Sequence, residues 1–295
     1  MRLRIGTRGS RLALAQASEV AALLADAGAE TELVPILTSG DRGASAEASP
    51  AGIKGLFVAE ITEALARGDV DLAVHSAKDL PSEDPPGVVV ASVPERAVPY
   101  DVLVSREGEL ADGGMVGTSS LRRRSQLLRS RPSLKVREVR GNVDTRLRKL
   151  GDGEFDALVL AAAGLARLGI DPEHAAPIPV EEMVPAPGQG ALAVQVHEGA
   201  PAAETVAKVD DPGSHIAFDT ERHLVRLLGG GCRLPLGAYA EWRDGVIRLL
   251  AVVVRPDGSE LLWSQVQATR PEDAAGEAAD ILRAGGADRI LEEVR

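Results

Sequence analysis

A short apolar strand that leads through a glycine- and hydroxyl-bearing loop into a helix occurs twice in this chain. The first predicted strand, Leu3–Ile5, runs into Gly6–Ser10 and then into a helix with apolar residues at helical spacing. The second, Met115–Val116, runs into Gly117–Ser120 and a new helix start. Strands that alternate with helices are typical of α/β proteins, and the free backbone N–H groups at such helix starts can bind anions. The pattern therefore predicts an α/β fold with two candidate anion-binding loops.

A third predicted strand, Leu72–Val74, carries polar side chains at its carboxyl end. An imidazole, a hydroxyl, an ammonium and a carboxylate follow in quick succession, from His75, Ser76, Lys78 and Asp79. Open α/β sheets bind ligands at the carboxyl ends of their strands. Lys78 beside Asp79 could bind an anion and stabilise a cation in one small space. The alternative is a solvated turn with a surface ion pair.

Basic residues are concentrated between Leu121 and Leu150, in a chain whose net charge is −11. Three arginines, Arg122–Arg124, stand in the first turn of the predicted helix, where cations oppose the helix macrodipole. Within this stretch only Glu138 and Asp144 oppose the basic residues. An anionic ligand explains this better than a solvated basic face does. Nucleic acid is a weaker alternative, because aromatic residues make up only 2% of the chain, so a small polyanion in a cleft is favoured.

The single cysteine, Cys232, excludes an intrachain disulfide and a zinc site built on several thiolates. It follows three glycines and precedes Arg233, so its thiol could reach from a loop into a neighbouring cleft. Covalent attachment and nucleophilic catalysis are the functional possibilities, and a small buried hydrophobic residue is the alternative. The chain has no apolar signal segment and no apolar run near the ~20 residues that span a bilayer, which predicts a cytoplasmic protein.

The length of 295 residues allows two or three domains. Two prolines in 94–99 predict a hinge into a second domain, and a strand that restarts after Gly190 predicts a return to the first. Two predicted strands, 246–254 and 260–268, flank a hairpin turn in a small antiparallel third domain. Residues 39–51 are predicted to be a mobile loop. We therefore divide the chain into domain 1 (1–95 and 190–209), domain 2 (96–189) and domain 3 (210–295).

Several motifs in combination resemble those of the porphobilinogen deaminase (hydroxymethylbilane synthase) family. Their order and spacing extend nearly from end to end of the chain, at residues 7–10, 54–57, 75–79, 117–123, 140–142, 188–190 and 230–232. The resemblance implies an α/β fold of two type II periplasmic-binding-protein-like domains with a cleft between them. A smaller C-terminal α+β domain with an antiparallel sheet is implied as the third.

The resemblance also implies an enzyme, a transferase of tetrapyrrole and haem biosynthesis. The family condenses four molecules of its substrate porphobilinogen head to tail, loses ammonia each time, and releases hydroxymethylbilane by hydrolysis. Its cofactor is a dipyrromethane held by a thioether to the cysteine that matches Cys232, with no metal or nucleotide. A monomer without nucleic-acid or membrane partners is implied. The alternative, a non-catalytic small-anion-binding protein on the same two-domain fold, needs the arginines but neither Cys232 nor Asp79.

The residues that match the family's site have three implied roles. Asp79 is the catalytic residue, whose carboxylate stabilises the cation left by the loss of ammonia. The implied cofactor-binding residues are Cys232, Lys78, Ser76, Thr118, Ser120, Arg122, Arg123, Arg140 and Arg146. The implied substrate-binding residues are Arg8, Ser10, Lys54, Arg140, Arg146, Arg167 and Gln189. Because each pyrrole carries an acetate and a propionate, such a cleft needs many fixed cations.

Two positions depart from the family's pattern. Pro50 stands where the family often has a lysine, and Gly229 stands where it often has a glutamate before the cysteine loop. One cleft cation is therefore missing or supplied elsewhere, and a more mobile attachment loop is expected.

Overall fold

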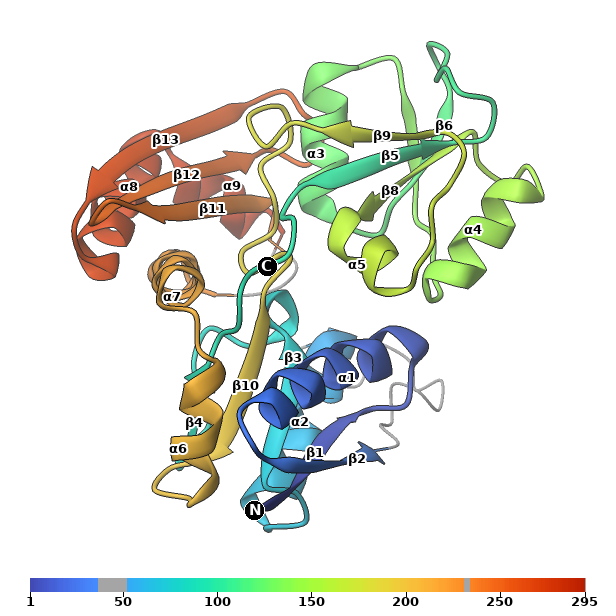
Figure 1. Cartoon of the computed structure of the whole chain (residues 1–295). Helices are drawn as coiled ribbons and strands as arrows, with labels where there is room; N and C mark the ends of the chain where they lie inside the picture. The colour runs from blue at the N-terminus through green and yellow to red at the C-terminus, as the bar shows by residue number, and fades with distance from the viewer. Residues whose placement is uncertain (37–51, 231–233, 295) are drawn as a thin grey trace.

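The computed structural model describes residues 1–36, 52–230 and 234–294, with backbone alone at 52–57 (Figure 1). The predicted loop at 39–51, the side chain of Lys54, and Cys232 lie outside the described residues. The described chain forms three sheets, around which the three parts seen in Figure 1 are built. We keep the names domain 1, domain 2 and domain 3 for these parts, and the exact domain boundaries stay a prediction.

Domain 1 is built on a five-stranded sheet of order β2-β1-β3-β10-β4. The strands are β1 (Arg2–Arg8), β2 (Glu30–Ile36), β3 (Leu72–Ser76), β4 (Val88–Ser92) and β10 (Leu192–His197). β1 is parallel to β2 and β3, whereas β10 is antiparallel to β3 and β4. The α-helices are α1 (Arg11–Asp26), α2 (Gly52–Ala66) and α6 (Ala202–Val206). The strand after Gly190 thus lies inside the first sheet, far along the chain from its neighbours.

Domain 2 is built on a second five-stranded sheet, of order β7-β6-β8-β5-β9. The strands are β5 (Asp101–Ser105), β6 (Met115–Gly117), β7 (Lys135–Arg137), β8 (Ala157–Ala161) and β9 (Ala175–Ile178). β6 is parallel to β7 and β8, and β5 is antiparallel to β8 and β9, so both large sheets share one pattern. The helices are α3 (Leu121–Ser130), α4 (Val143–Gly151) and α5 (Ala162–Arg167).

Domain 3 is a three-stranded antiparallel sheet covered by helices. Its strands are β11 (Leu236–Arg243), β12 (Val246–Val254) and β13 (Leu261–Ala268), and its helices are α7 (Pro212–Leu227), α8 (Pro271–Ala284) and α9 (Ala287–Glu292). Four alanines of α8 are buried, and their small side chains let the helix lie close to the sheet: Ala274, Ala275, Ala278 and Ala279. The predicted class, two α/β domains plus a smaller antiparallel domain, is confirmed.

The starts of α1 and α3 agree with the strand–loop–helix pattern of the sequence. The Oγ of Ser10 accepts a hydrogen bond from the backbone N–H of Ala13 at 3.3 Å, and the Oγ of Ser120 accepts one from Arg123 at 3.4 Å. Each serine satisfies a backbone donor that the helix itself leaves open. Each serine therefore fixes the end of its loop to the first turn of the helix that follows.

Glu221 of α7 joins domain 3 to both chain crossings between domains 1 and 2. Its buried carboxylate accepts hydrogen bonds from Nη1 of Arg96 at 2.6 Å and from the backbone N–H of Gly188 at 2.5 Å. It also accepts one from the backbone N–H of Ala240 in β11 at 2.7 Å. A buried carboxylate is stable only when it is paired in this way. Glu221 therefore ties domain 3 to both segments that connect domains 1 and 2.

Candidate active site

A cavity of about 110 Å³ lies between domains 1 and 2, and we call it the cleft cavity. Its lining includes predicted site residues from four separate elements: Arg8, Ser10, Ser76, Lys78, Asp79 and Arg167. Arg8 ends β1, and the residues around Asp79 follow β3, which is parallel to β1 and adjacent to it. Parallel neighbours end at the same sheet edge, which brings these side chains together. One carboxylate among several cations is the arrangement predicted from the sequence.

A second cavity of about 110 Å³ lies where all three domains meet, and we call it the three-domain cavity. Its polar lining comes from Lys78, Ser82, Ser120, Arg122 and Arg222, and its apolar lining includes Leu234, the residue that follows 231–233. Lys78 lines both cavities, so it stands between them. The chain position of Cys232 is therefore two residues from the wall of the three-domain cavity.

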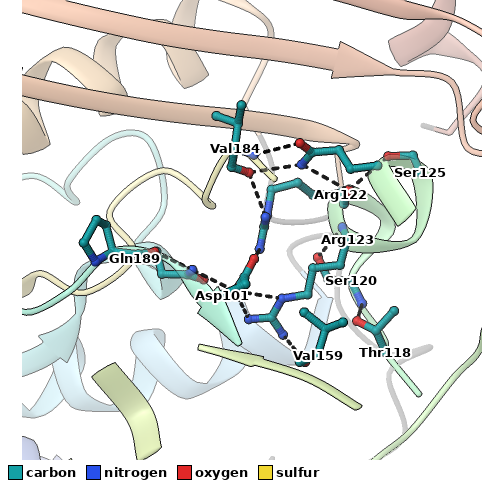
Figure 2. A network of polar contacts seen from close by, with 11 residues as sticks. Asp101, Thr118, Ser120, Arg122, Arg123, Ser125, Val159, Val184 and Gln189 are labelled. Atoms are coloured by element: carbon teal, nitrogen blue, oxygen red, sulfur yellow. Dashed lines mark hydrogen bonds and ion pairs between the residues drawn. The ribbon is translucent and has the colours of Figure 1, made fainter. Parts of the chain in front are cut away.

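Arg122 and Arg123 share a buried anionic partner, Asp101 at the start of β5 (Figure 2). Asp101 is 0% exposed; its Oδ2 accepts from Nη2 of Arg122 at 2.8 Å, and its Oδ1 from Nη2 of Arg123 at 2.7 Å. The remaining Nη1 groups donate to the carbonyls of Val184 and Val159. Burial raises the pKa of the Asp101 carboxyl, but the two guanidinium charges outweigh burial and hold that pKa well below its usual range.

This network corrects one inference from the sequence. Within 121–150 only two acidic residues oppose the basic ones, but Asp101, outside that stretch, pairs with two of the arginines at the start of α3. A buried structural partner therefore holds Arg122 and Arg123 in place, and it balances one of their two positive charges. Arg122 nevertheless lines the three-domain cavity, and its Nε is buried without a hydrogen-bond partner among the described residues.

The other predicted site residues whose side chains the structure describes line neither cavity. Thr118 is buried, and its hydroxyl accepts from the backbone of Ser120. Gln189 is 1% exposed and donates to the Pro99 carbonyl and to Asp101, so it stabilises the hinge rather than facing a cavity. Arg140 is exposed and paired with Glu138 at 3.0 Å, and Arg146 donates to the Gly141 carbonyl.

Sequence reasoning missed two charged residues: Arg222, which lines a cavity, and Asp101, which pairs with Arg122 and Arg123. Arg222 of α7 lines the three-domain cavity and is held by Asp84 through two hydrogen bonds of 2.7 and 2.8 Å. Asp101 could have been noticed as a lone acid at the start of an apolar strand, after the prolines of the hinge. Arg222 stands in a helix without a motif, and nothing in the sequence marks it.

His75 is a buried imidazole in the lining of the cleft cavity. Burial lowers its pKa to about 4, although the carboxylates of Asp79 and Asp84 partly oppose that shift. The unfolded chain binds a proton at this histidine below about pH 6.5, whereas the folded protein binds it only below about pH 4. We expect the free energy of unfolding to fall as the pH is lowered from 6.5 toward 4, by up to about 3 kcal/mol at this site.

Chemical denaturation at pH 7 and pH 5 of the parent and of His75→Gln tests this expectation. Glutamine cannot titrate, so the variant should lose less stability than the parent between the two pH values. An equal loss in both proteins would mean that His75 does not carry this pH dependence.

No helix among the described residues is long and apolar enough to cross a membrane.

Comparison with known proteins shows which family this chain resembles. A family model described as "Porphobilinogen deaminase, dipyromethane cofactor binding domain" matches residues 3–205, and one described as "Porphobilinogen deaminase, C-terminal domain" matches residues 216–283. The porphobilinogen deaminase of Rubrobacter xylanophilus is 48% identical over 100% of this chain and 98% of its own. That of Thermus thermophilus is 44% identical over 99% of this chain and 98% of its own.

Among solved structures, the methionine-binding protein MetQ aligns with a TM-score of 0.45 and 16% identity, over 70% of this chain and 89% of that one. The full-length likeness to the curated relatives and the two family models decides the assignment. This chain belongs to the porphobilinogen deaminase family.

Proposed function

We propose that this protein is a hydroxymethylbilane synthase, a cytoplasmic, monomeric transferase of tetrapyrrole biosynthesis. It would join four porphobilinogen molecules head to tail with loss of ammonia, then release hydroxymethylbilane by hydrolysis. The observation that carries the proposal is the cleft cavity, where the carboxylate of Asp79 lies among Arg8, Lys78 and Arg167. Family membership supports the same reaction.

The cations of the cleft cavity suit a substrate that bears two carboxylates. Arg8 and Arg167 offer planar guanidinium groups, which bind carboxylates through paired hydrogen bonds. Lys78 adds a point charge between the two cavities, and Ser10 and Ser76 add hydroxyls at the same sheet edge. We assign these residues to the acetate and propionate groups of porphobilinogen, with Lys54 as a further candidate.

Asp79 is assigned the role opposite to that of the cations. Loss of ammonia leaves positive charge on the substrate pyrrole, and a fixed carboxylate close to that charge stabilises the transition state. The same carboxylate can accept a hydrogen bond from a pyrrole N–H and so orient the ring. His75, which lines the same cavity, is neutral near pH 7 and adds no positive charge beside Asp79.

The three-domain cavity fits the dipyrromethane that the family implies. Its lining offers Lys78, Ser120 and Arg122 to the carboxylates of such a group, and the buried Nε of Arg122 is a donor that an anion would satisfy. Cys232 would hold the group through its thiol. When bound, the dipyrromethane supplies the pyrrole carbon to which the first substrate unit is joined.

The non-catalytic alternative, an anion-binding protein on the same fold, needs the arginines but has no use for a reactive thiol. The denatured intact mass of the purified protein beside Cys232→Ser separates the two. We expect excess mass equal to two linked pyrrole units in the parent and none in the variant.

If the purified parent lacks the pyrrole group, both proteins are incubated with porphobilinogen before the mass is measured. This incubation should add mass to the parent and none to Cys232→Ser. If the parent acquires no mass after that incubation and releases no ammonia, the anion-binding alternative replaces the enzyme.

A further inference from the structure

Arg167, at the end of α5 in domain 2, has its anionic partner in domain 1. Its Nε donates to Oε2 of Glu19 at 2.7 Å, and its Nη2 donates to Oε1 of Glu19 at 3.2 Å. The same Nη2 donates to the carbonyl of Gly190 at 3.1 Å. The Arg167 side chain is only 8% exposed, whereas that of Glu19 is 37% exposed. The Arg167 side chain is therefore held in the protein interior, whereas the Glu19 side chain is partly exposed to water.

The pair lies at the boundary of the cleft cavity. Arg167 lines that cavity, as do Leu12 and Gln16 of α1. Glu19 stands three residues after Gln16 and seven after Leu12, so it continues the same face of the helix. α1 and α5 also approach each other directly, because a Cβ at Gly164 would lie 3.8 Å from the Leu12 side chain. Figure 1 shows these two helices facing each other across the two domains.

We propose that Glu19 is a placeholder carboxylate, which neutralises Arg167 until a carboxylate of the substrate replaces it. The exchange also breaks the ion pair between α1 and α5, so substrate binding removes one contact between the two domains. The proposal deepens the proposed function and rests on it, since it takes Arg167 as a substrate-binding residue. Glu19 is a positioning residue, because it acts through Arg167.

The physical reason for the exchange is the unequal exposure of the two partners. A buried guanidinium without an anion is strongly unfavourable, so Arg167 needs a counter-charge in the empty protein. A substrate carboxylate offers the same bidentate geometry that Glu19 offers. Glu19 can return to water at little cost, whereas Arg167 stays fixed by the Gly190 carbonyl. One carboxylate thus replaces another, with no unpaired charge left behind.

A second ion pair across the same two domains provides a matched control. Nη1 of Arg11 in α1 lies 2.6 Å from Oδ1 of Asp144 in α4, and both side chains are well exposed. Neither residue lines the cleft cavity. Asp144→Asn removes a link between domains, as Glu19→Gln does, but it leaves the partner of Arg167 in place.

The test compares steady-state kinetics with porphobilinogen in the parent, Glu19→Gln and Asp144→Asn. Without a competing carboxylate, Glu19→Gln should lower KM by about threefold to fivefold, the range of a partly exposed ion pair, while kcat changes less than twofold. Asp144→Asn should leave KM unchanged. If both variants lower KM equally, or if Glu19→Gln leaves KM unchanged or raises it, the placeholder role is wrong.

A second measurement reads Arg167 without turnover. Modification by phenylglyoxal, followed at the peptide of Arg167 by mass spectrometry, should be faster in Glu19→Gln than in the parent or in Asp144→Asn. Equal rates in all three proteins overturn the proposal. A parent that turns over porphobilinogen while these rates are equal overturns the placeholder alone, whereas a parent with no turnover overturns the proposed function.

Discussion

Asp79→Asn is expected to lower the turnover of porphobilinogen by about 100- to 1000-fold, the usual cost of removing one preorganised charge at a reacting centre. The amide keeps the shape of the side chain, so the fold and the binding of carboxylates by Arg8, Lys78 and Arg167 should persist. What the variant loses is the negative charge that stabilises the cation formed when ammonia leaves. The effect should therefore appear in kcat more than in KM.

Ammonia release and product formation measure this loss, and the denatured intact mass shows whether the variant still carries the pyrrole adduct. Glu83→Gln is a matched control, because it makes the same change of charge four residues away, on an exposed side chain that lines neither cavity. The control should turn over at the parent's rate. Near-normal turnover by Asp79→Asn would remove Asp79 from the mechanism.

Asp101→Asn is expected to cause the largest loss of stability, about 3–5 kcal/mol in the free energy of unfolding. The carboxylate is fully buried between Arg122 and Arg123, and it also accepts from Gln189 at 2.8 Å. An asparagine leaves two buried guanidinium groups without a counter-charge. Denaturant unfolding at pH 7 measures the loss, and Glu32→Gln, which breaks an exposed pair with Arg2, should cost no more than about 1 kcal/mol.

The pH dependence of the stability difference between the parent and Asp101→Asn is a second test of the role of this carboxylate. The pKa of Asp101 is lowered in the folded protein, so its stabilisation is fully present above the pKa of the unfolded chain, about 4, and is lost as the pH falls below it. The gap between parent and Asp101→Asn should therefore narrow between pH 7 and about pH 3. A gap that stays constant or widens on acidification would contradict the assigned role of the carboxylate.

Local sequence signals predicted much of the fold. The apolar strand before His75, the helix starts after Ser10 and Ser120, and the hairpin before residue 260 depend on neighbours within a few residues, and the structure contains all of them. Strands β7, β9 and β11 were not predicted. β7 and β9 are only three and four residues long, which is too short for an alternation of apolar and polar side chains to be recognised.

The sequence by itself determined the chemistry of the candidate site: a carboxylate after a buried strand, a surplus of arginine, and one cysteine after three glycines. Only the tertiary structure decided which charges pair with each other. Asp101 meets Arg122 across 21 residues, and Glu19 meets Arg167 across 148. A buried guanidinium is stable only when a carboxylate lies beside it. Which carboxylate lies there depends on sheet order and on the contacts between domains, and not on spacing along the chain.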